Sequence, residues 1–147
     1  MIRCIAPDEV DILAAMDREI FGDGAYPVAA IRQLFDLAPR LQLIAEDDDG
    51  PVGYALGGIS VGGHRGWLLT LGVRAVARRR GVGQKLVDAT LAALHHAKVE
   101  EALVCVHPQN EPAVRLYQRA GFGLLTEDDA YFGPGEPRLV LHQPLRR

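Results

Sequence analysis

The stretch that decides the fold reads Leu68-Leu69-Thr70-Leu71-Gly72-Val73 and continues, after four residues, into Arg78-Arg79-Arg80-Gly81-Val82-Gly83-Gln84. The apolar run is typical of a buried strand, and the apolar stripe after the second glycine is typical of an amphipathic helix. Gly81 and Gly83 lack a β-carbon, so the backbone amides between strand and helix can point together at one anion. The positive end of the helix dipole adds to that field. The stretch therefore predicts a phosphate-binding turn.

Two common nucleotide-binding loops do not fit this turn. A triphosphate loop places four residues between its glycines and ends in Lys-Ser or Lys-Thr, whereas one residue separates Gly81 from Gly83 here. A dinucleotide-binding turn requires a third glycine where Leu86 stands. A pyrophosphate turn of another kind remains, and its alternative is a surface turn with three solvated arginines.

A second motif lies downstream, in Asn110-Glu111-Pro112-Ala113-Val114-Arg115-Leu116-Tyr117-Gln118-Arg119-Ala120-Gly121-Phe122. Asn110 suits a helix N-cap, Pro112 is tolerated in a first turn, and Gly121 suits the helix end. One helical face carries Ala113, Leu116, Tyr117 and Ala120. Together the two motifs resemble the GNAT superfamily of acyl-coenzyme A N-acetyltransferases. The closest pattern is that of the ribosomal-protein alanine and other N-terminal acetyltransferases.

The composition is that of one globular domain covering residues 1–147, because 147 residues suffice for one core but not for two ordinary ones. The net charge of -3 gives no broad basic field, so nucleic acid is not an expected partner. No apolar run approaches the roughly 20 residues that span a bilayer, and the first residues lack a signal-peptide pattern. We therefore expect a cytoplasmic protein with no membrane partner. Cys4 and Cys105 are too few for a disulfide framework or a metal site.

The rest of the chain alternates strand and helix patterns in the order βααβββαβαββ. Strands are expected over residues 2–5, 41–46, 52–61, 67–73 and 102–106, from 122, and over 138–142; helices are expected over 7–20, 28–37, 82–96 and 110–120. The resemblance implies an α/β (α+β) fold with a mixed, mostly antiparallel sheet. In that fold a central parallel pair of strands, here 68–73 and 102–106, splays apart between flanking helices.

The resemblance also implies acetyl-coenzyme A as the acetyl donor, with its pantetheine arm paired to the backbone of the first splayed strand and its diphosphate on the turn. The expected coenzyme-binding residues are Leu71, Gly72, Val73, Arg78, Arg79, Arg80, Gly81, Val82, Gly83, Gln84, Asn110 and Ala113. No metal is expected.

Attack of an amine on a thioester requires a proton acceptor, stabilisation of the oxyanion and a proton donor for the departing thiolate. Tyr117 is the expected donor, because a phenol pKa of about 10 is close to that of an alkyl thiol. The base is not identified: Cys105 and Trp67 stand where family members commonly carry an acid or a histidine. Cys105 also fits a small buried core residue. Water alone is one alternative, and three side chains could act through an ordered water: Glu19, His64 and His107.

The expected acceptor-binding residues are Phe21, Tyr26 and Tyr131. Tyr131 and Phe132 resemble the paired aromatics of N-terminal acetyltransferases, although a hairpin covering the sheet edge would read the same way. The hypothesis is transfer of an acetyl group from acetyl-coenzyme A to a primary amine, on a protein N-terminus or a small metabolite, by direct attack in a ternary complex. The alternative is a non-catalytic acyl-coenzyme A binding or sensing module. The expected partner is the amine acceptor, and the expected assembly is a monomer or homodimer.

Overall fold

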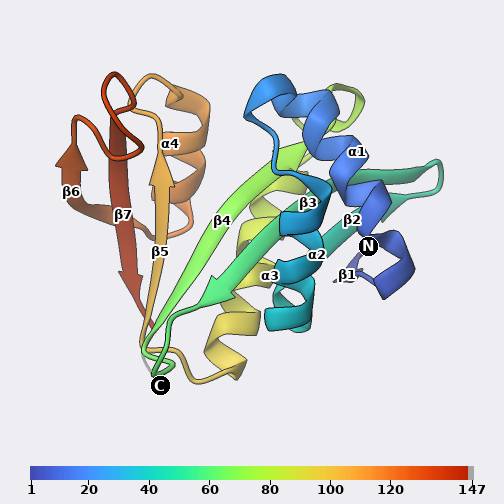
Figure 1. Ribbon diagram of the computed structural model, residues 1–147, viewed down its shortest axis with the longest axis horizontal. Coiled ribbons are helices and arrows are strands. Elements are labelled where there is room, and N and C mark those ends of the chain that lie inside the picture. Colours follow the sequence, from blue (N-terminus) through green and yellow to red (C-terminus); the bar gives the residue numbers. More distant parts are fainter. Residues whose placement is uncertain (146–147) are drawn as a thin grey trace.

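The computed structural model describes residues 1–145 and contains helices and strands in the expected order (Figure 1). The elements are β1 (Ile2–Cys4), α1 (Val10–Phe21), α2 (Val28–Leu37), β2 (Leu43–Asp47), β3 (Gly50–Ile59), β4 (Arg65–Val73), α3 (Val82–His96), β5 (Glu101–Val106), α4 (Glu111–Arg119), β6 (Gly123–Asp128) and β7 (Arg138–Pro144). Short 3-10 turns lie at Pro7–Glu9, Gly22–Gly24, Pro39–Leu41 and Ala75–Ala77. Within residues 1–145, none of the helices has the length and apolar character needed to span a membrane.

The sheet has seven strands in the order β1-β2-β3-β4-β5-β7-β6. β4 and β5 run parallel, and every other neighbouring pair is antiparallel. The predicted mixed, mostly antiparallel sheet with one central parallel pair is therefore confirmed.

The two central strands separate along their length, as Figure 1 shows. Pairing runs from Arg65 opposite Glu101 to Leu68 opposite Val104 and then stops. At the same point the pairing of β4 with β3 shifts by one residue, because Leu69 is skipped between Leu68 and Thr70. A bulge of this kind bends the strand that carries it. We infer that the extra residue turns β4 away from β5, so its last residues face β5 with their backbone unpaired.

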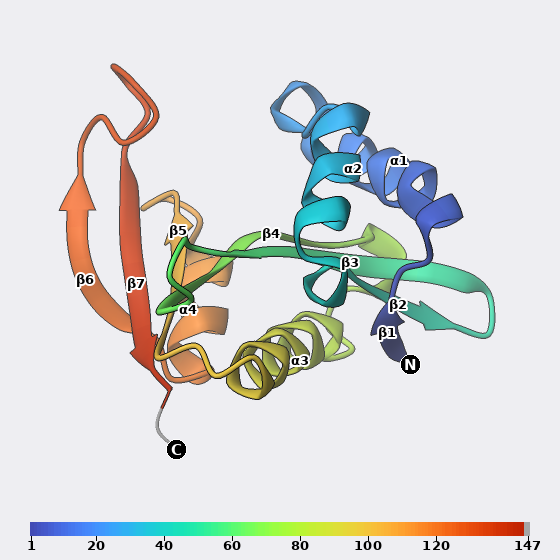
Figure 2. The same cartoon turned by 60° about the horizontal axis from the view of Figure 1, so that its bottom comes forward.

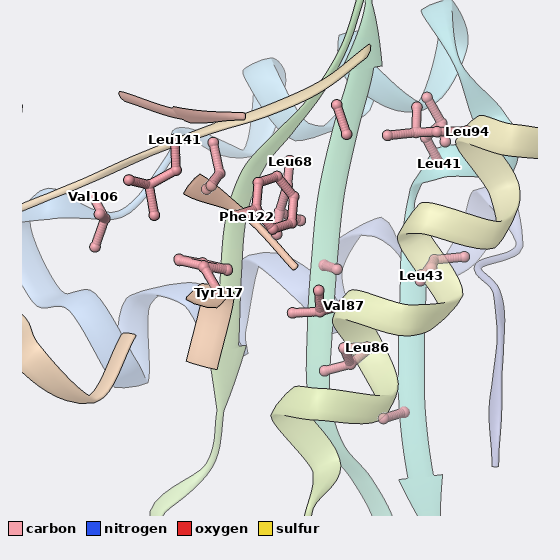
Figure 3. Close-up of a cluster of buried hydrophobic side chains, with 14 of the residues drawn as sticks. Leu41, Leu43, Leu68, Leu86, Val87, Leu94, Val106, Tyr117, Phe122 and Leu141 are labelled. Carbon is pink, nitrogen blue, oxygen red and sulfur yellow. The ribbon is translucent and has the colours of Figure 1, made fainter. Parts of the chain in front are cut away.

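Helices cover both faces of the sheet, with α1 and α2 on one face and α3 and α4 on the other (Figure 2). The core between the sheet and α3 and α4 contains Leu68, Leu86, Tyr117 and Phe122 (Figure 3). The second core, under α1 and α2, is centred on Leu13, Ile31, Ile44, Tyr54 and Leu56. Burial of one large apolar side chain contributes roughly 1.5–3 kcal/mol. Because each face of the sheet carries several such side chains, packing on both faces stabilises the central strands.

One element boundary differs from the sequence expectation for a reason outside local pattern. Leu41 belongs to a 3-10 turn, and β2 begins two residues later, after the fully buried Gln42. The Gln42 amide donates to the carbonyl oxygens of Leu34 and Ala38 at the end of α2 and accepts from the Gly57 amide. This side chain satisfies two carbonyl groups at the end of α2 and one backbone amide of β3. Such contacts join distant segments, so the spacing of apolar residues along the sequence does not predict them.

Candidate active site

A cleft of about 680 Å³ opens where β4 leaves β5. Its lining combines the end of β4, the turn before α3 and one face of α4: Ile20, Phe21, Leu71, Gly72, Val73, Ala77, Arg78, Arg79, Gly81, Val82, Gly83, Gln84, Asn110, Pro112, Ala113, Leu116 and Arg119. Three of these residues are arginines and none is acidic. A cleft of this charge fits a long ligand that carries several phosphates.

The turn between β4 and α3 has the backbone conformation of an anion-binding loop. Arg79 and Gly81 have φ angles of 67° and 78°, so two residues of the turn lie in the left-handed region. Successive amides in a turn conformation can point toward a common centre and bind an anion. The Arg78 guanidinium donates to the Val73 carbonyl oxygen at 3.2 Å and fixes the turn to the end of β4. The amino end of α3 therefore presents its amides, and its positive dipole end, to the cleft.

Two glycines of the cleft allow close packing of the residues around them. A β-carbon on Gly83 would lie 3.3 Å from Leu116 and 3.8 Å from Val73, two residues that line the cleft. A β-carbon on Gly72 would lie 2.6 Å from the Tyr54 ring and 2.9 Å from Ile20. Gly72 is thus required for packing under the strand, whereas Gly83 leaves room beside the ligand path.

The three successive arginines do not all face the cleft. Arg78 and Arg79 line it, whereas the Arg80 side chain points toward Asp47 at 3.7 Å and is absent from the lining. Arg119, which the sequence did not single out, contributes the third cation from the last turn of α4. Its spacing of three residues from Leu116, on the same helical face, was the signal that could have found it.

The helix α4 positions the two polar residues predicted from the second motif. The Asn110 side-chain oxygen accepts from the Ala113 amide at 3.3 Å, so Asn110 caps the helix while lining the cleft. Tyr117 is 6% exposed, and its ring meets that of Phe122 edge to face at 5.9 Å between centroids (Figure 3). Burial raises the pKa of Tyr117 well above the ordinary phenol value, and the charge of an ionised Cys105 adds to the shift. The phenol is protonated at neutral pH, as any tyrosine is, but its raised pKa makes it a weaker acid than the match with an alkyl thiol, expected from the sequence, assumes.

Cys105 lies on β5 directly after Val104, the last residue of that strand that pairs with β4, so it stands at the fork of the two strands. Burial, followed by the charge of an ionised Cys105, raises the pKa of Tyr26 before α2, of Tyr117 on α4 and of Tyr131 after β6. Burial likewise raises the pKa of Cys105 itself, and the positive charge of Arg138 on β7 opposes that rise. The three tyrosines that the sequence proposed separately thus all respond to the charge of Cys105, and Arg138, which the sequence did not suggest, acts on the same thiol.

The other candidate bases lie elsewhere or are already paired. Trp67 sits in the paired part of β4 opposite Leu103 and lines a separate apolar groove of about 730 Å³ between the ends of α2 and α3. His64 lies in the turn before β4 and faces Glu100 at 3.4 Å, at the end of the strand away from the cleft. Two further pairings involve the remaining candidates: Glu19 with Arg74 at 3.0 Å, and the His107 ring with the Gln109 amide at 3.1 Å.

The residues expected to bind the acceptor are aromatic. Phe21, at the end of α1, lines the cleft and is 42% exposed. Tyr131 packs edge to face on Phe132 at 4.8 Å between centroids, and the Arg138 guanidinium lies 4.9 Å from the Phe132 ring centroid. The loop between β6 and β7 is therefore held to β7 by ring and cation contacts.

The site thus combines a basic turn with a strand pair that opens beyond Leu68, beside a cleft without acidic residues. The family of the protein is shown by sequence: the model of the acetyltransferase (GNAT) family matches residues 9–122, and the chain belongs to that family. Residues 9–122 therefore form an acetyltransferase domain of the GNAT family.

Two curated relatives are similar in sequence. A mycothiol acetyltransferase of Propionibacterium freudenreichii is 34% identical over 102 residues, a match covering 67% of this chain and 32% of that enzyme. The chain therefore spans about a third of the length of this relative. An N-alpha-acetyltransferase of Sulfurisphaera tokodaii is 28% identical over 113 residues, covering 69% of this chain and 68% of that protein.

Solved structures share the fold at lower identity. The structure of Ard1 from Thermoplasma volcanium superposes with a TM-score of 0.89 at 20% identity, covering 100% of this chain and 98% of that one. A chain of the NatC complex bound to Gag peptide and CoA gives a TM-score of 0.90 at 19% identity, with coverage of 99% and 98%. These likenesses confirm the GNAT-like fold that the two sequence motifs predicted.

Proposed function

We propose that the protein transfers the acetyl group of acetyl-coenzyme A to the free amino group of a peptide N-terminus by direct attack within a ternary complex. One observation carries the proposal. The unpaired part of β4 begins where Leu68 lies opposite Val104, the residue before Cys105 on β5, and it ends at the basic turn, with Leu71, Gly72 and Val73 lining the cleft.

The donor would lie along the cleft with its diphosphate at the amino end of α3. The amides of Gly81, Gly83 and Gln84 and the guanidinium groups of Arg78 and Arg79 would bind the phosphates. The backbone of Leu71, Gly72 and Val73 would pair with the pantetheine arm, because these residues line the cleft and have no strand partner on the β5 side. Val82, Asn110 and Ala113 line the same cleft and would contact the rest of the coenzyme. Arg80 would contribute its backbone rather than its charge.

Tyr117 would donate a proton to the departing thiolate. A phenol is protonated at neutral pH, and Tyr117 lies on α4 next to Leu116 of the cleft. Cys105 would stay a neutral thiol, because burial raises its pKa. A neutral thiol is a poor nucleophile, which favours direct attack by the amine over an acyl-cysteine intermediate. The amine would lose its proton to water, since Cys105 and Trp67 stand at the positions where a carboxylate would be expected.

The acceptor would enter between the loop before α2 and the loop after β6. Phe21, Tyr26 and Tyr131 would contact it, and Asp128 at the end of β6 and Asp129 after it would attract a cationic amino group. A peptide N-terminus is favoured over a small metabolite by the similarity to an N-alpha-acetyltransferase and to a NatC complex that holds a peptide.

The missing carboxylate favours one competing function, a module that binds or senses acyl-coenzyme A without transferring the group. The test is an acceptor panel: peptides varied in their first two residues, polyamines, amino acids and aminoglycosides, with acetyl-coenzyme A and continuous measurement of released thiol. We expect release with peptides and less with the other amines, and loss of release in Tyr117→Phe. Tight coenzyme binding with no transfer to any amine would favour the sensing module. Sedimentation of the same protein would decide between the predicted monomer and homodimer.

A further inference from the structure

Asp17 is a buried carboxylate that the chemistry described above does not use. It lies on α1 and is 1% exposed. No cation pairs with it within the part of the chain that the structure describes. A buried charge is costly unless hydrogen bonds compensate it, so what Asp17 binds is informative.

Both carboxylate oxygens accept hydrogen bonds, and the two donors come from different elements. The Tyr26 backbone amide, in the loop between α1 and α2, donates to Asp17 Oδ2 at 2.6 Å. The Tyr54 hydroxyl on β3 donates to Asp17 Oδ1. Tyr54 is fully buried, and burial and the Asp17 bond raise its pKa well above the ordinary value, so it is protonated and remains a donor.

Each donor leads to a different half of the proposed site. Tyr26 is one of the side chains proposed above to bind the acceptor. The Tyr54 ring packs under Gly72, a residue of the cleft that would hold the coenzyme, because a β-carbon there would lie 2.6 Å from the ring and 2.8 Å from the hydroxyl oxygen. Ile20 and Phe21, one turn beyond Asp17 on the same helix, also line that cleft.

We propose that Asp17 and Tyr54 form a positioning pair that fixes the loop carrying Tyr26 against the strand carrying the acetyl donor, and so sets the site for the acceptor amine. The pair touches neither reactant. This inference rests on the proposed acetyl transfer. Loss of the pair would free the loop without disturbing the basic turn at the other end of the cleft, so acceptor recognition would weaken and coenzyme binding would not.

Tyr54→Phe is the sharpest variant, because it keeps the ring under Gly72 and removes only the hydroxyl. Asp17→Asn is the second, and Asp11→Asn, an exposed position on the same helix, is the matched control. We expect the acceptor KM at saturating acetyl-coenzyme A to rise about tenfold in both test variants, the loss of one charge-assisted bond. The Kd for acetyl-coenzyme A should stay within about twofold, and Asp11→Asn should match the parent protein.

Amide hydrogen exchange gives a second readout that needs no acceptor. The Tyr26 amide should exchange about tenfold faster in Asp17→Asn and Tyr54→Phe, with the amides of α3 unchanged. An unchanged acceptor KM in both variants, a fall in kcat alone, or coenzyme affinity falling as far as acceptor affinity would overturn the proposal. If the parent protein acetylates no amine, the proposed function fails, and unchanged exchange at Tyr26 would then overturn this inference separately.

Discussion

The backbone of Gly81 offers a test of the phosphate-binding turn that leaves its charges untouched. Its φ of 78° lies in the left-handed region, and no heavy atom lies within 4 Å of the position that a β-carbon would take. An L-residue in that conformation costs roughly 1–2 kcal/mol. Gly81→Ala therefore changes the conformational preference of the turn without a clash with any other residue.

Because nothing packs against the turn at this position, we expect the alanine backbone to relax to negative φ in the free protein. The amides that follow would then no longer converge. Binding of acetyl-coenzyme A would have to restore the left-handed conformation, and affinity would fall by the cost of doing so. A cost of about 1–2 kcal/mol corresponds to about a 5- to 30-fold increase in Kd.

The assay is calorimetric titration with coenzyme A, with Gly63→Ala as the matched control. Gly63 has a φ of 76° and equally open surroundings, but it lies in the turn between β3 and β4, at the far end of β4. The same strain is thus introduced away from the cleft, and we expect its Kd to stay within about twofold of the parent value. An unchanged Kd for Gly81→Ala, or an equal loss in both variants, would refute the reasoning.

Three further predictions concern other parts of the chain. Tyr117→Phe should lower kcat by at least about 100-fold with little change in coenzyme affinity, and unchanged turnover would remove this residue from the chemistry. Arg79→Ala should weaken coenzyme A binding about tenfold, whereas Arg80→Ala should not, because its side chain faces Asp47 outside the cleft; equal losses would contradict the observed lining. The Arg3 guanidinium lowers the pKa of Glu9 from 4.5 to about 2, so the pair stabilises the fold above pH 4.5 and loses that effect as pH falls toward 2. The stability difference between parent and Glu9→Gln in urea should accordingly shrink from pH 6 to pH 3.

Much of the fold could be predicted from the sequence because its signals are local. The stripe of apolar residues in α3 and the turn glycines fall at short, regular spacings that reflect one helix or one turn at a time. The cap at Asn110 depends on a contact three residues away, and it forms as expected. The order of strands was harder to obtain, because it depends on contacts between distant segments, and it came from the resemblance of two motifs to a family.

The candidate site likewise contains residues that local motifs predict and residues that depend on contacts between distant segments. The sequence named the turn and most of the residues that line the cleft, since these lie in two contiguous motifs. It could not choose among three successive arginines, because the direction of each side chain depends on backbone angles that are set by the contact of the turn with β4. It also missed Arg119 and Arg138, whose roles appear only when α4 and β7 lie beside the open strand pair.

The sequence by itself therefore determined which elements form, in which order, and where a phosphate would bind, because hydrophobic period, capping and glycine position act over a few residues. Only the tertiary structure decided that β4 parts from β5 after Leu68, that Cys105 stands at the fork of these strands, and that the carboxylate of Asp17 is buried between a loop and a strand. These features depend on a bulge at Leu69 and on pairs of residues far apart in the chain. Their geometry is set by packing of whole elements against one another, which no local pattern encodes.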